Sequence, residues 1–306
     1  MSTDNSAFSP STASAEGMKE IKPQNTTLCF VNGDIEYAER DGKKLHLAMI
    51  RPYSPGETIM KKLPLIVYVQ GSAWQRQNIY LPVPQLSRFA LRGFVIASVA
   101  FRESDISPFP AQMRDCKTAI RFLRANAEAY GIDVDNITLW GDSSGGHTAL
   151  MAGITGDSDP DTDDYNGYSC QVNAIVNYYG PSDLVTMGNY QSIMDCASAD
   201  GPIGLLLGKI PVAEHLELAK EASPVTYVSV DKPCPPVLTL HGDSDQIVPF
   251  EQGVSIYEAL MKAGKHTEFY KLLGADHGTG EFWVDEIFDI VEEFIRRFSV
   301  QSNSIS

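Results

Sequence analysis

Two patterns of apolar residues alternate along the chain, and each predicts one kind of element. Residues 65–70 and 94–100 are continuous apolar runs, as is typical of strands covered on both faces of a sheet. Residues 112–129 place apolar side chains every three or four positions, the spacing of an amphipathic helix. The sequence also predicts strands at 35–38, 45–50, 137–140, 174–179, 237–241 and 268–273, and helices at 144–155, 251–263 and 281–298. This alternation predicts an α/β fold, with a mostly parallel sheet and helices on both faces.

The segments outside this alternation suggest how the chain is divided. Residues 1–25 are polar and are expected to form a mobile tail, and residues 26–300 are expected to form a single domain. Residues 185–222 follow no single period, so we expect a small cap over the site, with a long surface excursion as the alternative. Residues 157–164 are acidic, but Thr162 and Tyr168 stand where a calcium-binding EF-hand loop needs Gly and Glu, which favours a solvated loop.

Composition and charge narrow the possible partners. The 306 residues include 39 Asp plus Glu against 24 Lys plus Arg, a formal net charge of −15. This balance argues against nucleic acid and anionic membranes, because binding phosphates requires clustered Lys and Arg. No apolar run is long enough to span a membrane, and residues 1–17 lack the basic start and apolar centre of a secretory signal, which predicts a cytoplasmic protein. The five cysteines lack Cys-x-x-Cys spacing, so they indicate neither a disulfide framework nor a metal site.

The sharpest chemical signal is Gly141-Asp142-Ser143-Ser144-Gly145, where a predicted strand meets a predicted helix. This is the setting of a G-x-S-x-G nucleophile elbow, in which a strained turn pushes the central serine out of the sheet. The helix that follows presents free N–H groups to a developing oxyanion. We therefore predict that Ser143 is a nucleophile and that the N–H of Ser144 is one oxyanion donor.

A nucleophilic serine needs a histidine base and an orienting carboxylate, which follow it in the order Ser, acid, His on this kind of fold. His277 lies in a loop after the last predicted strand, where the base is expected. The other five histidines are poorly placed, because they lie before the elbow, inside predicted elements or in the insert. For the acid, Asp243 and Asp245 both follow the strand at 237–241, and Asp183 is a weaker candidate.

Further oxyanion donors should come from the loop after an early strand. That loop is Gln70-Gly71-Ser72-Ala73-Trp74, in which small residues allow the backbone to turn inward. Trp74 could form a wall of a pocket for the acyl group, or it could simply pack beside the loop.

Together these motifs resemble the α/β-hydrolases, in particular carboxylesterases related to hormone-sensitive lipase and to bacterial feruloyl and acetyl-xylan esterases. The family sequence G-D-S-A-G-G is similar to residues 141–146, and the family sequence H-G-x-x-D-x-x-V-P is similar to residues 241–249. The resemblance implies that Asp245 is the acid, that His277 is the base, and that the backbone N–H groups of Ser72 and Ala73 join Ser144 in the oxyanion hole. It also implies an α/β-hydrolase fold with a small cap insert, hydrolysis of a small-molecule ester, and no metal or organic cofactor.

The loop before Trp74 departs from the family pattern, which reads H-G-G-G-W or H-G-G-A-W. Here Gln70 replaces the histidine and Ser72 replaces a glycine, so we expect backbone strain at Ser72. The expected substrates are short-chain acyl or feruloyl esters, such as those on fragments of plant cell-wall polysaccharide. An arylformamidase and a non-catalytic binding protein on the same fold are the alternatives, whereas a peptidase with an additional propeller does not fit in 306 residues.

Overall fold

The fold is built on one sheet of eight strands, seen in a computed structural model that describes residues 9, 11–22, 27–54, 61–158 and 165–300. The strand order is β1-β2-β4-β3-β5-β6-β7-β8. The strands are β1 (Leu28–Arg40), β2 (Lys43–Tyr53), β3 (Leu63–Val69), β4 (Val95–Val99), β5 (Ile132–Asp142), β6 (Ala174–Tyr178), β7 (Val237–Gly242) and β8 (Thr267–Leu272). The pairs β1–β2 and β2–β4 are antiparallel and the others are parallel, which confirms the predicted sheet.

Side chains of the central strands point alternately to two hydrophobic cores. Along β3, Leu65, Val67 and Val69 face one core, and Ile66 and Tyr68 face the other. All five are buried, because helices cover both faces. A continuous apolar run is therefore the expected sequence for a strand in this position.

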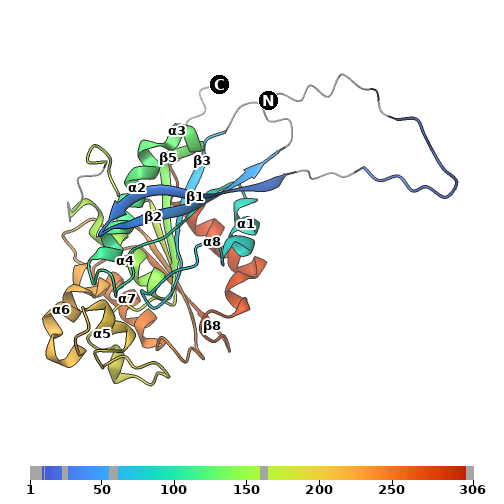
Figure 1. The fold of residues 1–306 in the computed structure, drawn as a ribbon. Helices are drawn as coiled ribbons and strands as arrows, with labels where there is room; N and C mark the ends of the chain where they lie inside the picture. Colours follow the sequence, from blue (N-terminus) through green and yellow to red (C-terminus); the bar gives the residue numbers. More distant parts are fainter. Residues whose placement is uncertain (1–8, 10, 23–26, 55–60, 159–164, 301–306) are drawn as a thin grey trace.

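Eight α-helices lie among the described residues, and most of them cover the sheet. They are α1 (Val83–Ala90), α2 (Ala111–Ala125), α3 (Ala127–Tyr130), α4 (Ser144–Thr155), α5 (Pro202–Leu206), α6 (Leu216–Glu221), α7 (Glu251–Lys262) and α8 (Asp285–Arg297). Helices α2, α4 and α7 pack on one face, and α1 and α8 pack on the other (Figure 1). Helix α1 was not predicted from the pattern of apolar positions.

Two predicted helices are divided in the structure. The helix predicted at 112–129 ends at Ala125, because the Asn126 side chain donates a hydrogen bond to the Phe122 carbonyl (2.8 Å) and its backbone leaves the helical region. The helix predicted at 281–298 begins as a 3₁₀ helix over Gly280–Trp283, and α8 starts only at Asp285, after the extended residue Val284. These breaks set the positions of short loops without changing the order of the elements.

The insert at 185–222 folds around a small hydrophobic core of its own. It contains α5, α6 and two 3₁₀ helices, Met187–Asn189 and Val212–Glu214, and Figure 1 shows α5 and α6 together at one end of the sheet. Its core includes Trp74 and Val248, which follow β3 and β7 respectively. The insert therefore lies against the loops at the carboxyl ends of these strands, where active sites occur in open α/β sheets.

Parts of two expected segments lie outside the described residues. Residues 159–164 of the acidic segment and residues 1–8, 10 and 23–26 at the amino-terminal end belong to this group. Residues 11–22 are described, contain no helix or strand and are exposed.

Among the described residues, the helices are all too short or too polar to cross a membrane.

The packing of α1 on the sheet gives a test of the second core. Phe89 is fully buried there, with its ring 5.0 Å from Trp140 and 5.2 Å from Phe288. We expect Phe89→Ala to lower the free energy of unfolding by about 3–5 kcal/mol, through lost transfer energy and the cavity left behind. Leu91→Ala, at the exposed end of the same helix, should change it by less than about 0.5 kcal/mol. Urea unfolding measures the free energy of unfolding of both variants. A loss in Phe89→Ala as small as that in Leu91→Ala would contradict this packing.

Candidate active site

Ser143 occupies a strained turn between β5 and α4. Its φ of 52° and ψ of −128° lie in a region that L-residues rarely adopt, and its N–H donates to the Tyr178 carbonyl (2.9 Å). Glycines make the turn possible, because a Cβ at Gly141 would overlap the Gly145 backbone, and one at Gly145 would overlap the Val69 backbone. The turn places the Ser143 hydroxyl above the carboxyl end of the sheet.

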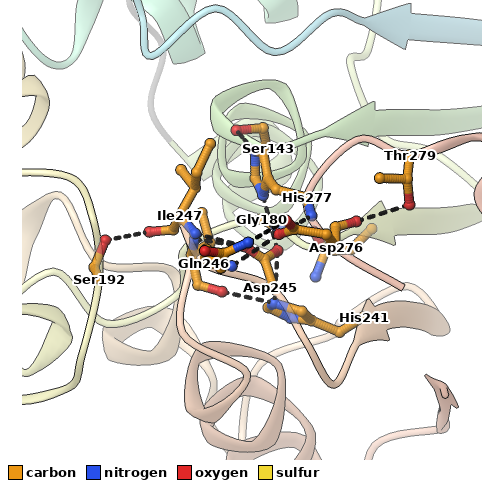
Figure 2. Close-up of polar contacts among 12 residues, drawn as sticks. Ser143, Gly180, Ser192, His241, Asp245, Gln246, Ile247, Asp276, His277 and Thr279 are labelled. Atoms are coloured by element: carbon orange, nitrogen blue, oxygen red, sulfur yellow. Dashed lines mark hydrogen bonds and ion pairs between the residues drawn. The ribbon is translucent and has the colours of Figure 1, made fainter. Parts of the chain in front are cut away.

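Ser143, His277 and Asp245 form a continuous chain of hydrogen bonds (Figure 2). The Ser143 Oγ lies 2.9 Å from His277 Nε2, and His277 Nδ1 lies 2.8 Å from Asp245 Oδ2. The three residues come from three loops at the carboxyl ends of β5, β7 and β8. With the proton on Nδ1, His277 donates to Asp245 and its Nε2 accepts the Ser143 O–H, the arrangement of a serine activated by a base.

The side chain of Asp245 is fully buried and has polar partners at both of its oxygens. Its Oδ1 accepts the N–H groups of Ile247 (2.9 Å) and Val248 (2.8 Å), and its Oδ2 faces His277 and His241. Burial alone would raise the pKa of Asp245, but hydrogen bonds from the two histidines outweigh it and hold this pKa well below its usual value. The carboxylate is therefore ionised wherever the protein is folded near neutral pH.

The other two candidate acids have different partners. Asp243 Oδ1 accepts the Gly274 N–H (2.7 Å), which fixes the turn after β7. Asp183 Oδ1 accepts the N–H groups of Val185 (3.1 Å) and Thr186 (3.3 Å), an Asx-type turn after β6. Of the three, the geometry brings only Asp245 to His277.

The loop after β3 lies against the elbow, but Ser72 differs from expectation. The Gly71 N–H donates to Asp142 Oδ1 (3.0 Å), and a Cβ at Gly71 would lie 2.7 Å from the Asp142 carbonyl. The Ser72 N–H, expected to point to an oxyanion, donates instead to Ser144 Oγ (2.9 Å). A serine side chain after the nucleophile thus occupies a donor that an alanine would leave free.

The expectation of strain at Ser72 is wrong. The positive φ angles of this loop are at Ala73 (53°) and Trp74 (56°), while Ser72 has an ordinary negative φ. The Ser72 hydroxyl donates to the Gln75 carbonyl (2.7 Å), so its side chain closes the turn. The Gln70 side chain also stabilises the loop, because its Oε1 accepts the Asn78 N–H (2.9 Å).

A small apolar cavity lies beside Ser143. Its volume is about 20 Å³, and roughly 10–15 Å³ is enough to hold one water molecule. Trp74 lines it and also packs in the core of the insert. The other lining residues belong to the elbow, the insert and the loops after β3, β6 and β7: Ala73, Ser143, Ser144, Pro181, Met187, Met194, Cys196, Pro202, Ile203, Ile247 and Val248. His277 is not part of this lining.

Two histidines that the sequence analysis set aside are buried next to the site. His241 Nε2 lies 2.9 Å from the Val248 carbonyl and 3.3 Å from Asp245 Oδ2. His147 accepts the Trp74 indole N–H at Nδ1 (3.1 Å). A spacing of four residues, from His241 to Asp245 and from Ser143 to His147, is the signal that could have identified them. Within the described part of the chain, no group of three or more His, Cys, Asp or Glu is placed to hold a metal ion.

The fold and this arrangement define an α/β-hydrolase, and comparison with known proteins agrees. The family model BD-FAE matches residues 53–260, and the chain belongs to this family.

The curated relatives that this chain matches include proteins named as esterases. This chain is 30% identical to Esterase LipQ of Mycobacterium tuberculosis, in an alignment that covers 80% of this chain. It is 31% identical to Esterase LipC of the same organism, in an alignment that covers 71% of this chain. It covers 56% and 53% of these proteins, so it spans about half the length of the curated relatives it matches.

Among solved structures, a truncated carbohydrate esterase from gut microbiota has a TM-score of 0.76 at 28% identity, covering 91% of this chain and 99% of that one. Propionate-bound esterase 2 of Thermogutta terrifontis has a TM-score of 0.69 at 25% identity, covering 90% of this chain and 97% of that one.

The lowered pKa of Asp245 predicts how its contribution to stability changes with pH. A carboxyl group whose pKa is lower in the folded protein stabilises it above the unfolded value, near 3.9, and less as the pH falls toward the folded value. We therefore expect Asp245→Asn to cost about 1.5–3 kcal/mol at pH 7 and progressively less below about pH 4. Urea unfolding from pH 7 to pH 3 checks this, with Ser244→Ala as the exposed, non-ionisable control. A cost that stays constant over this range would contradict the pKa shift.

Proposed function

We propose that this protein hydrolyses carboxylic esters of short acyl groups through an acyl-enzyme on Ser143. The observation that carries the proposal is the chain of hydrogen bonds from Asp245 through His277 to Ser143, beside a small apolar cavity. A serine so connected can attack a carbonyl, and the cavity can take the group that remains bound to it.

Each half of the reaction uses the same three side chains. His277 Nε2 takes the proton of Ser143 Oγ as this oxygen attacks the ester carbonyl, and Asp245 stabilises the imidazolium that forms. When the tetrahedral intermediate collapses, the C–O bond to the alcohol breaks and His277 returns the proton to that alcohol. Water then attacks the acyl-enzyme, again losing its proton to His277, and the acid leaves with the Ser143 hydroxyl restored.

Backbone donors at the elbow and in the loop after β3 would hold the oxyanion. The N–H of Ser144 lies at the start of α4, and the N–H of Ala73 belongs to the loop that lines the same cavity. Ser72 would contribute indirectly, because its N–H polarises the Ser144 hydroxyl. A single oxyanion donor is typically worth about 10²–10³ in kcat.

The cavity favours a small acyl group. The alcohol must reach His277 to be protonated, and His277 does not line the cavity, so the cavity is assigned to the acyl side. Its volume of about 20 Å³ accommodates a methyl group far better than a feruloyl ring. A neighbouring structure of the Thermogutta terrifontis esterase is described as propionate-bound, which supports short acyl groups.

We assign acetylated carbohydrates, such as fragments of plant cell-wall polysaccharide, as the substrate class. Support comes from the carbohydrate esterase of gut microbiota, which covers 91% of this chain.

The nucleophile gives the first test. Ser143→Ala should lower kcat for p-nitrophenyl acetate by about 10³-fold or more, because the triad acts as a unit, and should abolish labelling by a fluorophosphonate. Ser87→Ala, on α1 away from the site, should change neither. An unlabelled, inactive wild-type protein would favour the non-catalytic binding protein, and a tenth of wild-type activity in Ser143→Ala would sink the assignment of the nucleophile.

The acyl cavity gives the second test. In a series of p-nitrophenyl esters, kcat/KM should be highest for acetate and fall about tenfold or more by butyrate, because each extra methylene must displace packed side chains. Ile203→Ala removes part of the wall, so the ratio of kcat/KM for acetate to that for butyrate should fall about tenfold.

Ile210→Ala, outside the cavity lining, is the control for this ratio. Methyl ferulate and N-formylkynurenine extend the panel to the other two substrate classes. A kcat/KM for either above that for acetate would replace the short-acyl proposal with a feruloyl esterase or an arylformamidase.

A further inference from the structure

The loop that should bind the oxyanion is held in an unfavourable backbone conformation. Ala73 and Trp74 are consecutive residues with positive φ, and neither is a glycine. L-residues avoid this region because Cβ approaches the carbonyl oxygen, so such a pair persists only where surrounding contacts over-determine it. The Trp74 side chain, with 2% of its surface exposed, supplies these contacts.

His147 is the polar partner of the Trp74 indole. Trp74 Nε1 donates to His147 Nδ1 (3.1 Å), and the two rings meet edge to face with centroids 5.0 Å apart. Because Nδ1 accepts, the proton lies on Nε2, which donates to the Ala222 carbonyl (2.7 Å). Burial lowers the pKa of His147 to about 4, so at neutral pH the ring remains the neutral acceptor that Trp74 requires.

The same helix carries His147 and follows the nucleophile. His147 lies in the first turn of α4, where its N–H donates to the Ser143 carbonyl (3.0 Å). The distance between the nucleophile and the loop after β3 is therefore set through one rigid turn of helix. The His147 side chain does not itself line the cavity, but its partner Trp74 does, so the route from His147 to the site runs through Trp74.

The end of the insert also contacts His147, through the Ala222 carbonyl. Ala222 is the residue at which α6 ends, and Trp74 packs in the hydrophobic core of the insert with residues such as Met187 and Ile203. His147 thus joins three parts of the chain that are distant in sequence: the loop after β3, helix α4 and the end of the insert.

We propose that His147 is a positioning residue, which holds the Ala73–Trp74 loop in its strained conformation so that the Ala73 N–H faces the developing oxyanion. This inference rests on the proposed esterase function. Since the oxyanion forms only in the transition state, loss of the His147 contact should lower kcat while KM changes little.

Two substitutions of His147 separate its hydrogen bonds from its volume. His147→Phe keeps a ring of similar size but removes both hydrogen bonds, and kcat for p-nitrophenyl acetate should fall about 10- to 100-fold with KM within threefold. His147→Gln can accept from Trp74 through its amide oxygen and donate to the Ala222 carbonyl through its amide nitrogen, so kcat should stay within fivefold. His215→Phe, at an exposed histidine of the insert, is the matched control and should be unchanged.

A double-mutant cycle tests whether His147 acts through Trp74. Trp74→Phe removes the indole N–H and should lower kcat about as much as His147→Phe, and the double variant should lose no more than either single one. If the fold-losses in kcat of the two single variants multiply in the double variant, the two residues act independently. That result would overturn the route through Trp74. If His147→Phe does not fold, as judged by circular dichroism, the decision rests on Trp74→Phe alone, and a kcat within threefold of wild type overturns the proposal.

Other results of these assays would also overturn the proposal that His147 is a positioning residue. A folded His147→Phe with kcat within threefold, or with an effect confined to KM, shows a structural or binding role and overturns the proposal. Equal losses in His147→Phe and His147→Gln would overturn it too, because the conservative variant should rescue kcat. Failure of the esterase function itself is distinguished by Ser143→Ala and by fluorophosphonate labelling of the wild-type protein, which do not depend on His147.

Discussion

The structure depends on how closely helix α4 approaches the ends of β3 and β5. No Cβ fits between Gly145 and the Val69 carbonyl, or between Gly141 and the Gly145 backbone. This contact forces the sharp turn at Ser143 and brings the loop after β3 against the elbow. Because protein interiors are close-packed, a single methyl group at either glycine would have to displace backbone. The nucleophile and the oxyanion loop are therefore parts of one packed unit.

Two buried carboxylates flank Ser143 in opposite electrostatic environments. Burial raises the pKa of Asp142, although its Oδ1 accepts hydrogen bonds from Tyr68 (2.5 Å) and Gly71 (3.0 Å). Asp245 is buried as well, yet hydrogen bonds from two histidines lower its pKa. Different environments thus give one residue type two tasks, with Asp142 fixing the loop and Asp245 orienting the proposed base.

The sequence allowed prediction of the sheet and of the strand–helix order, because continuous apolar runs and helical spacing survive in the folded protein. It also singled out Ser143, His277 and Asp245, which the structure brings together, although their catalytic roles stay a proposal. Helix α1 was missed because it spans only 8 residues, too few for a clear helical period. His147 and His241 were set aside because they lie inside predicted elements, and their contacts with Trp74 and Asp245 become visible only in the folded protein.

Ser72 shows why loop chemistry resists prediction from a motif. The motif places a side chain where the family has a glycine, and strain at that residue is the natural inference from covalent geometry. The chain instead shifts its positive φ angles to the next two residues, where the Trp74 side chain has a large apolar core and a hydrogen-bond partner to hold it. Ser72 and Ser144 then bond to each other, backbone N–H to hydroxyl. A departure at one position of the loop is thus balanced by the residue after the nucleophile, and the compensation is visible only when both sides of the contact are in place.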